Sequence, residues 1–348
     1  MPSNNLPQTQ PRVLIVGGGG FIGGHIVAQA LERGFDTWVA VRATTSRRRL
    51  GDPRLHFVVL DYDSPESMRK SLAEALPEGE RWDWVIYNLG ATKCLNFTDF
   101  NRINYIYLRD FVEALEAAGR TPERFLYMSS LSALGPGDEK GYEPLTDLTI
   151  PSPNTRYGVS KIKAETFLES RPELNWTIFR PTGVYGPCEQ DYLMMIKSID
   201  SHVDFGVGMR RQMLTFIYVT DLVNAMFDAL ATDTTIKRKY IISEDRAYSQ
   251  KEFRRMVAKA LGVKWVLPLK LPMWMAYAAS VVAEKIGLLR GKPSTLNRDK
   301  YKIMKQRNWN CDVTRACQDF GFRVEYPLER GVDLTVKAYK DAKKGGSK

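Results

Sequence analysis

The sequence predicts an α/β fold, with a doubly wound parallel sheet followed by a smaller C-terminal cap domain. Short β-branched or aromatic runs alternate with helical patterns from residue 12 to residue 179, and this alternation is typical of a parallel sheet covered by helices. The 348 residues suffice for one large domain or two unequal ones. A hydrophobic content of 44% and a charged content of 26% are ordinary for a soluble globular protein.

The first predicted element is a buried parallel strand at residues 12–16, because Val13 to Val16 form an uninterrupted apolar run. A helix follows the glycines at 17–20, with Phe21, Ile22 and Ile26 near helical spacing, and Gly34 ends it. We expect further strands at 38–41, 56–60, 84–87, 125–128 and 177–179, and helices at 65–76, 100–118 and 157–169.

The alternation becomes irregular from about residue 185 onward. Residues 184–216 are predicted to form turns and loops, and residues 216–230 a strand end that enters a helix. A strand at 239–242 and a helix at 249–261 follow, and residues 290–310 are basic and polar. We read the C-terminal portion as a domain that caps the ends of the sheet strands.

Cysteine and histidine usage excludes several kinds of site. The four cysteines have no CxxC spacing, so neither a disulfide framework nor a zinc site is predicted. The three histidines are far apart in the sequence, which leaves little material for a metal cluster or a Ser-His-Asp triad. A reducing, cytoplasmic compartment fits this usage best.

The longest uncharged apolar run near the C-terminus is Leu271–Ala283, which is too short to span a bilayer. A buried helix is the favoured interpretation, and a helix on a membrane surface or a substrate lid is the alternative, so peripheral membrane contact stays open. The polar, proline-rich N-terminus has no apolar core segment and is predicted to be a flexible leader and not a signal peptide. The net charge of +10 could indicate a nucleic-acid partner, but the sequence contains no signature of a nucleic-acid-binding module. We therefore predict no nucleic-acid partner.

Glycines between the first strand and its helix predict a dinucleotide site. In Gly17-x-x-Gly20-x-x-Gly23 the missing Cβ atoms permit a tight turn and let a pyrophosphate approach backbone N–H groups at the helix N-terminus. Phe21 and Ile22 belong to the same turn. This context makes a ligand-free glycine turn the weaker interpretation.

The residues after the second and third strands indicate which dinucleotide binds. An NAD site usually has an acidic residue after the second strand, whereas this chain has Arg42, whose guanidinium suits a 2′-phosphate. NADP(H) is therefore favoured, and NAD(H) stays open because Arg42 is also compatible with a solvated loop. After the third strand, Asp61 is predicted to bind the adenine amino group or to cap a helix, with Tyr62 beside it at the cofactor.

A Ser-Tyr-Lys set follows at the end of the fifth strand. Ser130 and Ser132 lie where open α/β sheets place their chemistry, and Tyr157 and Lys161 share one helix face at i and i+4. A nearby ammonium lowers the pKa of a phenol, and a serine hydroxyl can fix a substrate oxygen. The set predicts acid/base chemistry at Tyr157.

Four motifs, "VLIVGGGGFIG", "SSLSALG", "YGVSK" and "RPTGVYGP", occur in this order. Together they resemble the extended short-chain dehydrogenase/reductase superfamily, also called the NAD(P)-dependent epimerase/dehydratase family. The resemblance implies a Rossmann-type fold in which Ser130 is the active-site serine, Tyr157 the acid/base and Lys161 the residue at the nicotinamide ribose.

The resemblance extends to residues around this centre. It implies that Asn104 is the helix asparagine of the catalytic set, although its surrounding sequence departs from the family pattern. The implied cofactor and substrate residues, given in chain order, are Asn88, Gly90, Thr92, Lys93, Ser132, Pro181 and Gly183. The implied domains are a leader at 1–11, a dinucleotide-binding domain at 12–183 with returning segments near 214–245, a substrate-binding portion at 184–213 and 246–340, and a basic tail at 341–348.

Two features bear on the substrate. Sugar-nucleotide epimerases have an asparagine where this chain has Gly183, and residues 267–293 resemble 3β-hydroxysteroid dehydrogenase-like and dihydroflavonol reductase-like members. The leading hypothesis is an oxidoreductase that interconverts a secondary alcohol and a ketone on a hydrophobic, steroid-like small molecule. The alternatives are a sugar-nucleotide epimerase, dehydratase or reductase, with Lys93, Arg210 and Arg211 at a diphosphate, and a non-catalytic NADP(H) sensor. A homodimer is compatible with the resemblance.

Overall fold

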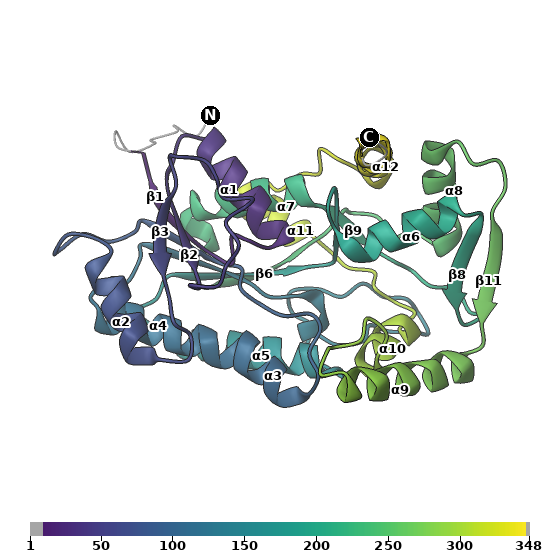
Figure 1. Cartoon of the computed structure of the whole chain (residues 1–348), viewed down its shortest axis with the longest axis horizontal. Coiled ribbons are helices and arrows are strands. Elements are labelled where there is room, and N and C mark those ends of the chain that lie inside the picture. The colour runs from purple at the N-terminus through teal and green to yellow at the C-terminus, as the bar shows by residue number, and fades with distance from the viewer. Residues whose placement is uncertain (1–9, 346–348) are drawn as a thin grey trace.

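The computed structural model describes residues 10–345 (Figure 1). Its centre is a seven-stranded sheet in the order β10-β6-β5-β4-β1-β2-β3, and every neighbouring pair is parallel. The predicted doubly wound parallel sheet is confirmed. The strands are β1 (Arg12–Val16), β2 (Asp36–Val41), β3 (His56–Val59), β4 (Trp84–Tyr87), β5 (Arg124–Met128), β6 (Trp176–Pro181) and β10 (Arg238–Ile242).

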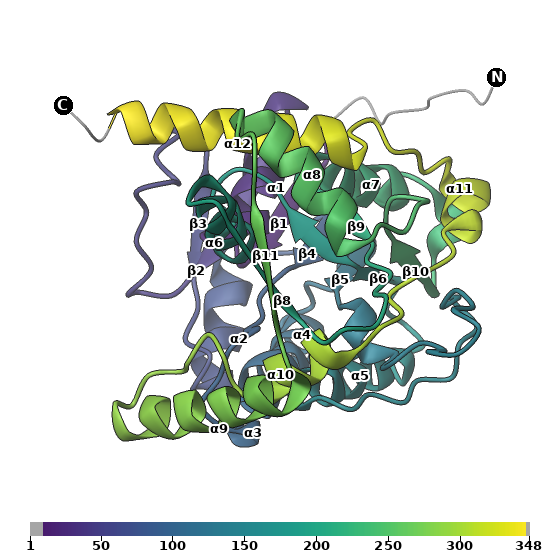
Figure 2. The same cartoon turned by 90° about the vertical axis from the view of Figure 1, so that its right-hand side faces the viewer.

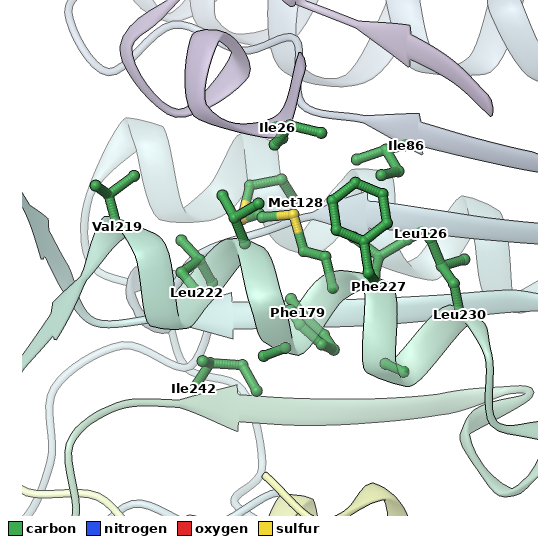
Figure 3. Close-up of a cluster of buried hydrophobic side chains, with 14 of the residues drawn as sticks. Ile26, Ile86, Leu126, Met128, Phe179, Val219, Leu222, Phe227, Leu230 and Ile242 are labelled. Atoms are coloured by element: carbon green, nitrogen blue, oxygen red, sulfur yellow. The ribbon is translucent and has the colours of Figure 1, made fainter. Parts of the chain in front are cut away.

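Helices cover both faces of the sheet because its strands are apolar on both sides. In β1, Val13 and Ile15 pack into one core, and Leu14 and Val16 pack into the other. Figure 3 shows the first of these cores, where Phe227 lies over the strands. The helices on that face are α1 (Phe21–Glu32), α7 (Val219–Leu230) and α11 (Thr314–Phe320), and those on the opposite face are α2 (Pro65–Glu74), α4 (Tyr107–Ala117) and α5 (Arg156–Glu169).

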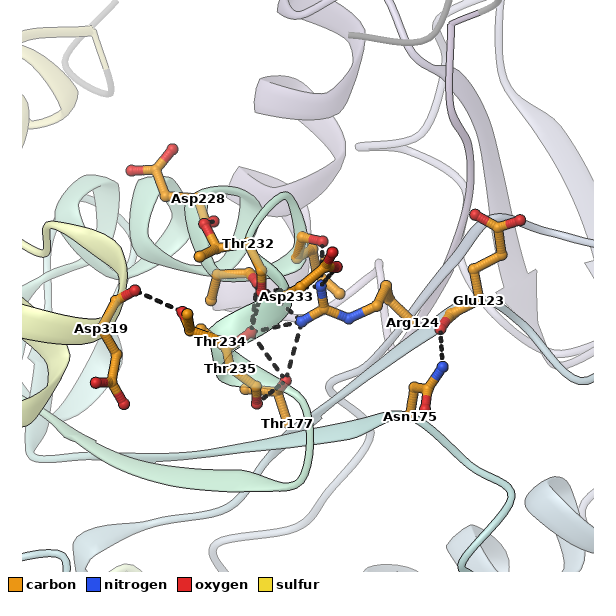
Figure 4. Close-up of polar contacts among 12 residues, drawn as sticks. Glu123, Arg124, Asn175, Thr177, Asp228, Thr232, Asp233, Thr234, Thr235 and Asp319 are labelled. Atoms are coloured by element: carbon orange, nitrogen blue, oxygen red, sulfur yellow. Dashed lines mark hydrogen bonds and ion pairs between the residues drawn. The ribbon is translucent and has the colours of Figure 1, made fainter. Parts of the chain in front are cut away.

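A buried arginine fastens α7 to the sheet at the end where the strands begin (Figure 4). The Arg124 guanidinium donates to the carbonyl oxygens of Ala229 at 3.0 Å, Leu230 at 2.9 Å and Thr232 at 3.0 Å. Ala229 and Leu230 are the last two residues of α7 and Thr232 follows closely, so the guanidinium is a charged donor at the helix C-terminus and offsets the helix dipole. The same chain segment continues as a 3-10 helix at Asp233–Thr235 into β10.

The C-terminal portion has its own small core, built on α6 (Gln190–Asp200), α8 (Gln250–Leu261) and α12 (Leu328–Gly345). Two parallel two-stranded sheets flank it, one of β7 (Gly183–Tyr185) with β9 (Phe216–Tyr218) and one of β8 (Val203–Val207) with β11 (Leu267–Leu271). The predicted turns and loops of residues 184–216 lie between regular elements that the prediction did not include, α6 and β8. Ile196 and Ile199 of α6 are buried against α8 and α12, and this packing stabilises the helix.

Two further expectations are corrected at the C-terminal end. The run Leu271–Ala283 does form a helix, α9 (Met273–Leu289), but its large apolar side chains face solvent, so the favoured buried helix is wrong. The tail predicted from residue 341 is helical to Gly345, because α12 continues there. Most of the predicted leader, residues 1–9, and the last three residues of the tail lie outside the described residues.

Candidate active site

A cavity of about 950 Å³ lies at the carboxyl ends of β1, β4, β5 and β6. The order of the strands reverses between β1 and β4, and open α/β sheets bind ligands in the crevice at this point. The glycine loop, Asn88, Ser130, Tyr157 and Pro181 all line this one cavity. Motifs that are far apart in the sequence therefore meet in a single site.

The glycine loop forms a cradle that side chains would block. Gly17 has φ +88°, and a Cβ on it would lie 2.9 Å from the backbone nitrogen of Leu89. A Cβ on Gly23 would lie 2.1 Å from the carbonyl oxygen of Gly17, so the third glycine sets how closely α1 approaches β1. Gly20 begins α1 without any side-chain cap. This geometry fits a pyrophosphate bound by backbone N–H groups at the helix N-terminus.

Arg42 lies at the outer end of the cavity, directly after β2. Its backbone N–H donates to Oγ1 of Thr45 at 3.0 Å, and the Thr45 methyl lies 3.5 Å from where a Cβ of Gly19 would be. The turn that carries Arg42 is therefore packed beside the glycine loop. Tyr62 lines the cavity and Asp61 does not; the Asp61 carboxylate accepts the backbone N–H of Asp63 at 3.0 Å. The adenine contact of Asp61 stays a prediction.

Local chemistry explains how the Ser-Tyr-Lys set is positioned. Thr155 caps α5 by accepting the N–H of Gly158 at 2.9 Å, which fixes the first turn that carries Tyr157. Ser130 begins the short 3-10 helix Leu131–Ala133 after β5, and its hydroxyl accepts the backbone N–H of Ser132 at 3.2 Å. Ser130 and Tyr157 line the same cavity as Lys161.

Burial controls the protonation of Tyr157 and Lys161. Burial raises the pKa of Tyr157 to about 12, and the hydrogen bond with Ser130 only partly opposes it. Burial also lowers the pKa of Lys161 to about 7, against the attraction of Glu165. The expected lowering of the Tyr157 pKa by Lys161 is absent. The Lys161 ammonium donates to the Met128 carbonyl at 2.7 Å, and this position leaves its nitrogen 5.9 Å from the centre of the Tyr157 ring. Tyr157 is thus a neutral phenol with a proton to donate.

A buried ion pair that the sequence reasoning missed lies next to Lys161. Glu165 and Arg180 are almost completely buried, and their closest atoms, Oε2 and Nη2, are 2.6 Å apart. The Ser129 hydroxyl donates to the other oxygen of Glu165 at 2.5 Å. Glu165 follows Lys161 by four residues, as Lys161 follows Tyr157, so the three side chains lie on one face of α5. This spacing in the sequence could have identified Glu165 as a residue of the site.

Asn104 supports the site from behind and does not line the cavity. It lies in a π-helical turn, Arg102–Ile106, and its side chain accepts the N–H of Ala91 at 2.7 Å and donates to the Ala91 carbonyl at 3.0 Å. It also donates to Ser160 on α5 at 2.9 Å. Asn104 therefore holds the Gly90–Ala91 loop against the catalytic helix, and its implied catalytic role stays a prediction.

The helix α10 (Arg298–Lys305) reaches the site from the C-terminal portion. Asp299, at its first turn, accepts the backbone N–H of Tyr157 at 3.3 Å across 142 residues of sequence. Lys300 and Lys93 both bond Asp191 at the start of α6, at 3.0 Å and 2.7 Å. Burial alone would raise the pKa of Asp191, but the two ammonium groups outweigh it and the pKa is lowered. No local pattern predicts these contacts, because each joins separate parts of the chain.

The wall opposite the glycine loop is largely aromatic and aliphatic. A Cβ on Gly183 would lie 2.1 Å from the Tyr192 hydroxyl, so this tyrosine occupies the space that a side chain at 183 would need. Tyr192 packs with Phe216, their ring centres 5.9 Å apart. Met195, Leu214, Ile303 and Trp309 complete the apolar lining.

Most of the predicted site residues line the cavity, and a few do not. Gly23, Asp61 and Asn104 lie outside its lining, as do Arg210 and Arg211. The predicted residues that line it are Gly17, Gly20, Phe21, Ile22, Arg42, Tyr62, Asn88, Gly90, Thr92, Lys93, Ser130, Ser132, Tyr157, Lys161, Pro181 and Gly183. Besides Asp191, Tyr192, Asp299 and Lys300, the sequence reasoning also missed the apolar wall.

Known proteins with similar sequences and structures fit this geometry. Bovine sterol-4-alpha-carboxylate 3-dehydrogenase (decarboxylating) is 25% identical over 250 residues, which cover 68% of this chain and 65% of that protein. A ceramide reductase from Caulobacter vibrioides is 23% identical over 330 residues, 95% of each chain. The crystal structure of a dTDP-glucose 4,6-dehydratase from Streptomyces venezuelae has a TM-score of 0.75 at 20% identity, covering 96% of this chain and 98% of that one. At this identity the structural likeness shows the fold alone.

The family assignment comes from a match that includes both the glycine loop and the Ser-Tyr-Lys set. Residues 13–243 match the model of the family described as "NAD dependent epimerase/dehydratase family". That range runs from β1 to the end of β10 and contains all four motifs on which the resemblance was based. The chain therefore belongs to the NAD dependent epimerase/dehydratase family, the extended branch of the short-chain dehydrogenases/reductases.

Proposed function

We propose that the protein is an NADP(H)-dependent oxidoreductase that interconverts a secondary alcohol and a ketone on an apolar substrate. The observation that carries this proposal is the meeting of three groups in one cavity. The glycine cradle with Arg42 provides the cofactor end, Ser130, Tyr157 and Lys161 provide the chemistry, and an apolar wall provides the substrate end.

Bound nicotinamide supplies the hydride donor or acceptor. The residues of the chain handle the proton and the oxygen. In the reducing direction, the Ser130 hydroxyl donates to the carbonyl oxygen and Tyr157 gives its phenolic proton to that oxygen as hydride reaches the carbon. Lys161 contacts the nicotinamide ribose and holds the cofactor beside Tyr157, and the buried Glu165 favours the charged form of Lys161.

The lining of the cavity supports an apolar substrate over a sugar nucleotide. Tyr192 fills the space beside Gly183, and Phe216 and Trp309 extend the apolar surface. Lys93, a candidate for binding a diphosphate, is paired with Asp191. The names of the bovine sterol dehydrogenase and the Caulobacter ceramide reductase describe proteins that act on lipid-like molecules, which agrees with this substrate class. The chain covers only 65% of the bovine relative, and the substrate itself is part of the proposal.

The NADP(H) preference rests on Arg42 and is tested by replacing it. Arg42→Ala should weaken NADPH binding by roughly 10- to 100-fold, because charge-assisted hydrogen bonds to the 2′-phosphate contribute about 1.5–3 kcal/mol. NADH binding should change little, since it has no phosphate at this position. Fluorescence titration of both cofactors measures the two constants.

Arg48→Ala is the matched control for Arg42→Ala. Arg48 is an exposed arginine of the same loop and does not line the cavity, so its loss should leave both cofactor affinities unchanged. An equal loss of NADPH and NADH affinity in Arg42→Ala would rule out the 2′-phosphate contact and with it the NADP(H) preference.

A further inference from the structure

Helix α9 is oriented opposite to an ordinary surface helix. A surface helix usually buries its apolar stripe and exposes its polar side chains. In α9 the buried positions are Ala276, Ser280, Glu284 and Gly287, which recur at helical spacing and are small or polar. The exposed positions carry the large apolar side chains: Trp274, Met275, Tyr277, Val282, Ile286, Leu288 and Leu289, with Trp274 71% and Leu289 88% exposed.

Polar bonds hold this orientation in place. Glu284 accepts from the Arg298 guanidinium at 2.9 Å and 3.0 Å and from the Arg298 backbone N–H at 3.1 Å, and Arg156 lies 3.4 Å away. The hydrogen bond with Arg298 lowers the pKa of Glu284 to about 2, so its carboxylate stays charged. Rotating the helix to bury its apolar face would break these bonds, and therefore the apolar face is a fixed feature of the fold.

The charges around the exposed face are almost all positive. From residue 270 to residue 292 the chain carries Lys270, Lys285, Arg290 and Lys292, and the one acid, Glu284, is buried and paired. A second copy of the chain placed against α9 would bring these cations opposite one another. An anionic surface complements them.

The helix lies along one edge of the molecule, with α10 on its inner side (Figures 1 and 2). Across residues 10–345 no helix combines the length and the apolarity that crossing a bilayer requires. A helix with exposed tryptophan, tyrosine and leucine and with flanking cations has the composition of one that lies in the plane of a membrane interface.

We propose that α9 is a docking surface for an anionic lipid bilayer, with Trp274, Val282 and Leu289 inserted among the lipids and Lys285 and Arg290 at the headgroups. The segment that follows α9 lines the active-site cavity through Thr295, Asn297 and Lys300. Docking therefore places one wall of that cavity beside the bilayer. The docking itself depends on neither cofactor nor turnover.

Co-sedimentation with vesicles tests the docking. Wild-type protein should bind vesicles of phosphatidylcholine and phosphatidylserine at least tenfold more tightly than vesicles of phosphatidylcholine alone, since each cation near an anionic surface contributes about 1 kcal/mol. Trp274→Glu/Val282→Glu/Leu289→Glu should lose at least tenfold in binding to the anionic vesicles. Leu148→Glu/Ile150→Glu, which alters two equally exposed apolar side chains elsewhere, should bind as the wild type does.

The contribution of the cations to vesicle binding is tested with one double variant at α9 and a matched control in α8. Lys285→Glu/Arg290→Glu should reduce binding to anionic vesicles roughly tenfold or more, whereas Lys251→Glu/Arg255→Glu, on the exposed side of α8, should not. Hydrogen–deuterium exchange of the wild type provides a readout that needs no variant, because residues 273–289 should become protected when anionic vesicles are added. Tyr157→Phe should bind vesicles normally, which separates docking from activity.

Three outcomes would overturn the proposal. The first is wild-type protein that binds neither kind of vesicle. The second is vesicle binding that survives both the apolar and the charge substitutions in α9. The third is a wild-type dimer, seen by sedimentation velocity, that the α9 substitutions convert to a monomer, because then a second copy covers this face.

Discussion

Replacing Tyr157 by phenylalanine should lower kcat by roughly 10²- to 10⁴-fold, the usual contribution of a positioned general acid. NADPH affinity should stay within about twofold of the wild type, because the substitution removes one oxygen and keeps the ring that packs 6.1 Å from Phe100. Steady-state kinetics and cofactor titration on the same preparation measure both quantities. The combination of lost turnover and retained binding is the expected signature of a proton donor.

Tyr301→Phe is the control for this substitution. Tyr301 also precedes a lysine by four residues, yet it lies outside the active-site cavity, so turnover should not change. Turnover in Tyr157→Phe within tenfold of the wild type would exclude Tyr157 as the proton donor. A wild type that binds NADPH but turns over no ketone or sugar nucleotide would favour the non-catalytic sensor instead.

The second large effect is expected at the buried ion pair next to Lys161. Glu165→Gln removes the charge that balances Arg180 where both side chains are shielded from water. Leaving one partner of a buried pair uncompensated typically lowers the free energy of unfolding by about 3–5 kcal/mol. Urea unfolding followed by circular dichroism measures this loss, and Glu329→Gln, in the exposed Lys259–Glu329 pair, should leave the midpoint unchanged.

The same substitution should shift the pH dependence of stability. Lys161 has a pKa of about 7 in the folded protein and an ordinary value of 10.5, so between these values the unfolded chain binds more protons and stability rises with pH. Glu165 raises the Lys161 pKa, and removing its charge should make this rise begin at a lower pH. Identical unfolding midpoints for Glu165→Gln and the wild type would contradict the role assigned to the pair.

The sequence predicts those parts of the fold and site that depend on local spacing. The glycine loop, Ser130 and the Tyr157–Lys161 pair are each defined by neighbours within a few residues, and all except Gly23 line the cavity. The alternation of apolar strands and amphipathic helices likewise predicts the parallel sheet, because a helix between two apolar strands lets them pair in parallel and covers one face of the sheet.

Contacts between distant segments could not be predicted in this way. Asp299 reaches the first turn of α5 only because α10 packs there, and β11 pairs with β8 from another part of the chain. In α9 the apolar content favoured burial, whereas the inward-facing positions are decided by the bonds of Glu284 to Arg298 and Arg156. Which face of such a helix is buried depends on its partners, and a single sequence does not show them.

The central claim is hydride transfer to an apolar ketone, and isotope transfer tests it most directly. Wild-type protein is incubated with NADPH that carries deuterium at both positions of nicotinamide C4, separately with a 3-ketosteroid, a long-chain 3-keto lipid and UDP-glucose, and the products are analysed by mass spectrometry. We predict one deuterium on the new carbinol carbon of an apolar ketone for each NADPH oxidised, and none with Tyr157→Phe. Conversion of UDP-glucose without net oxidation of NADPH, together with no label in either apolar product, would contradict the proposed function.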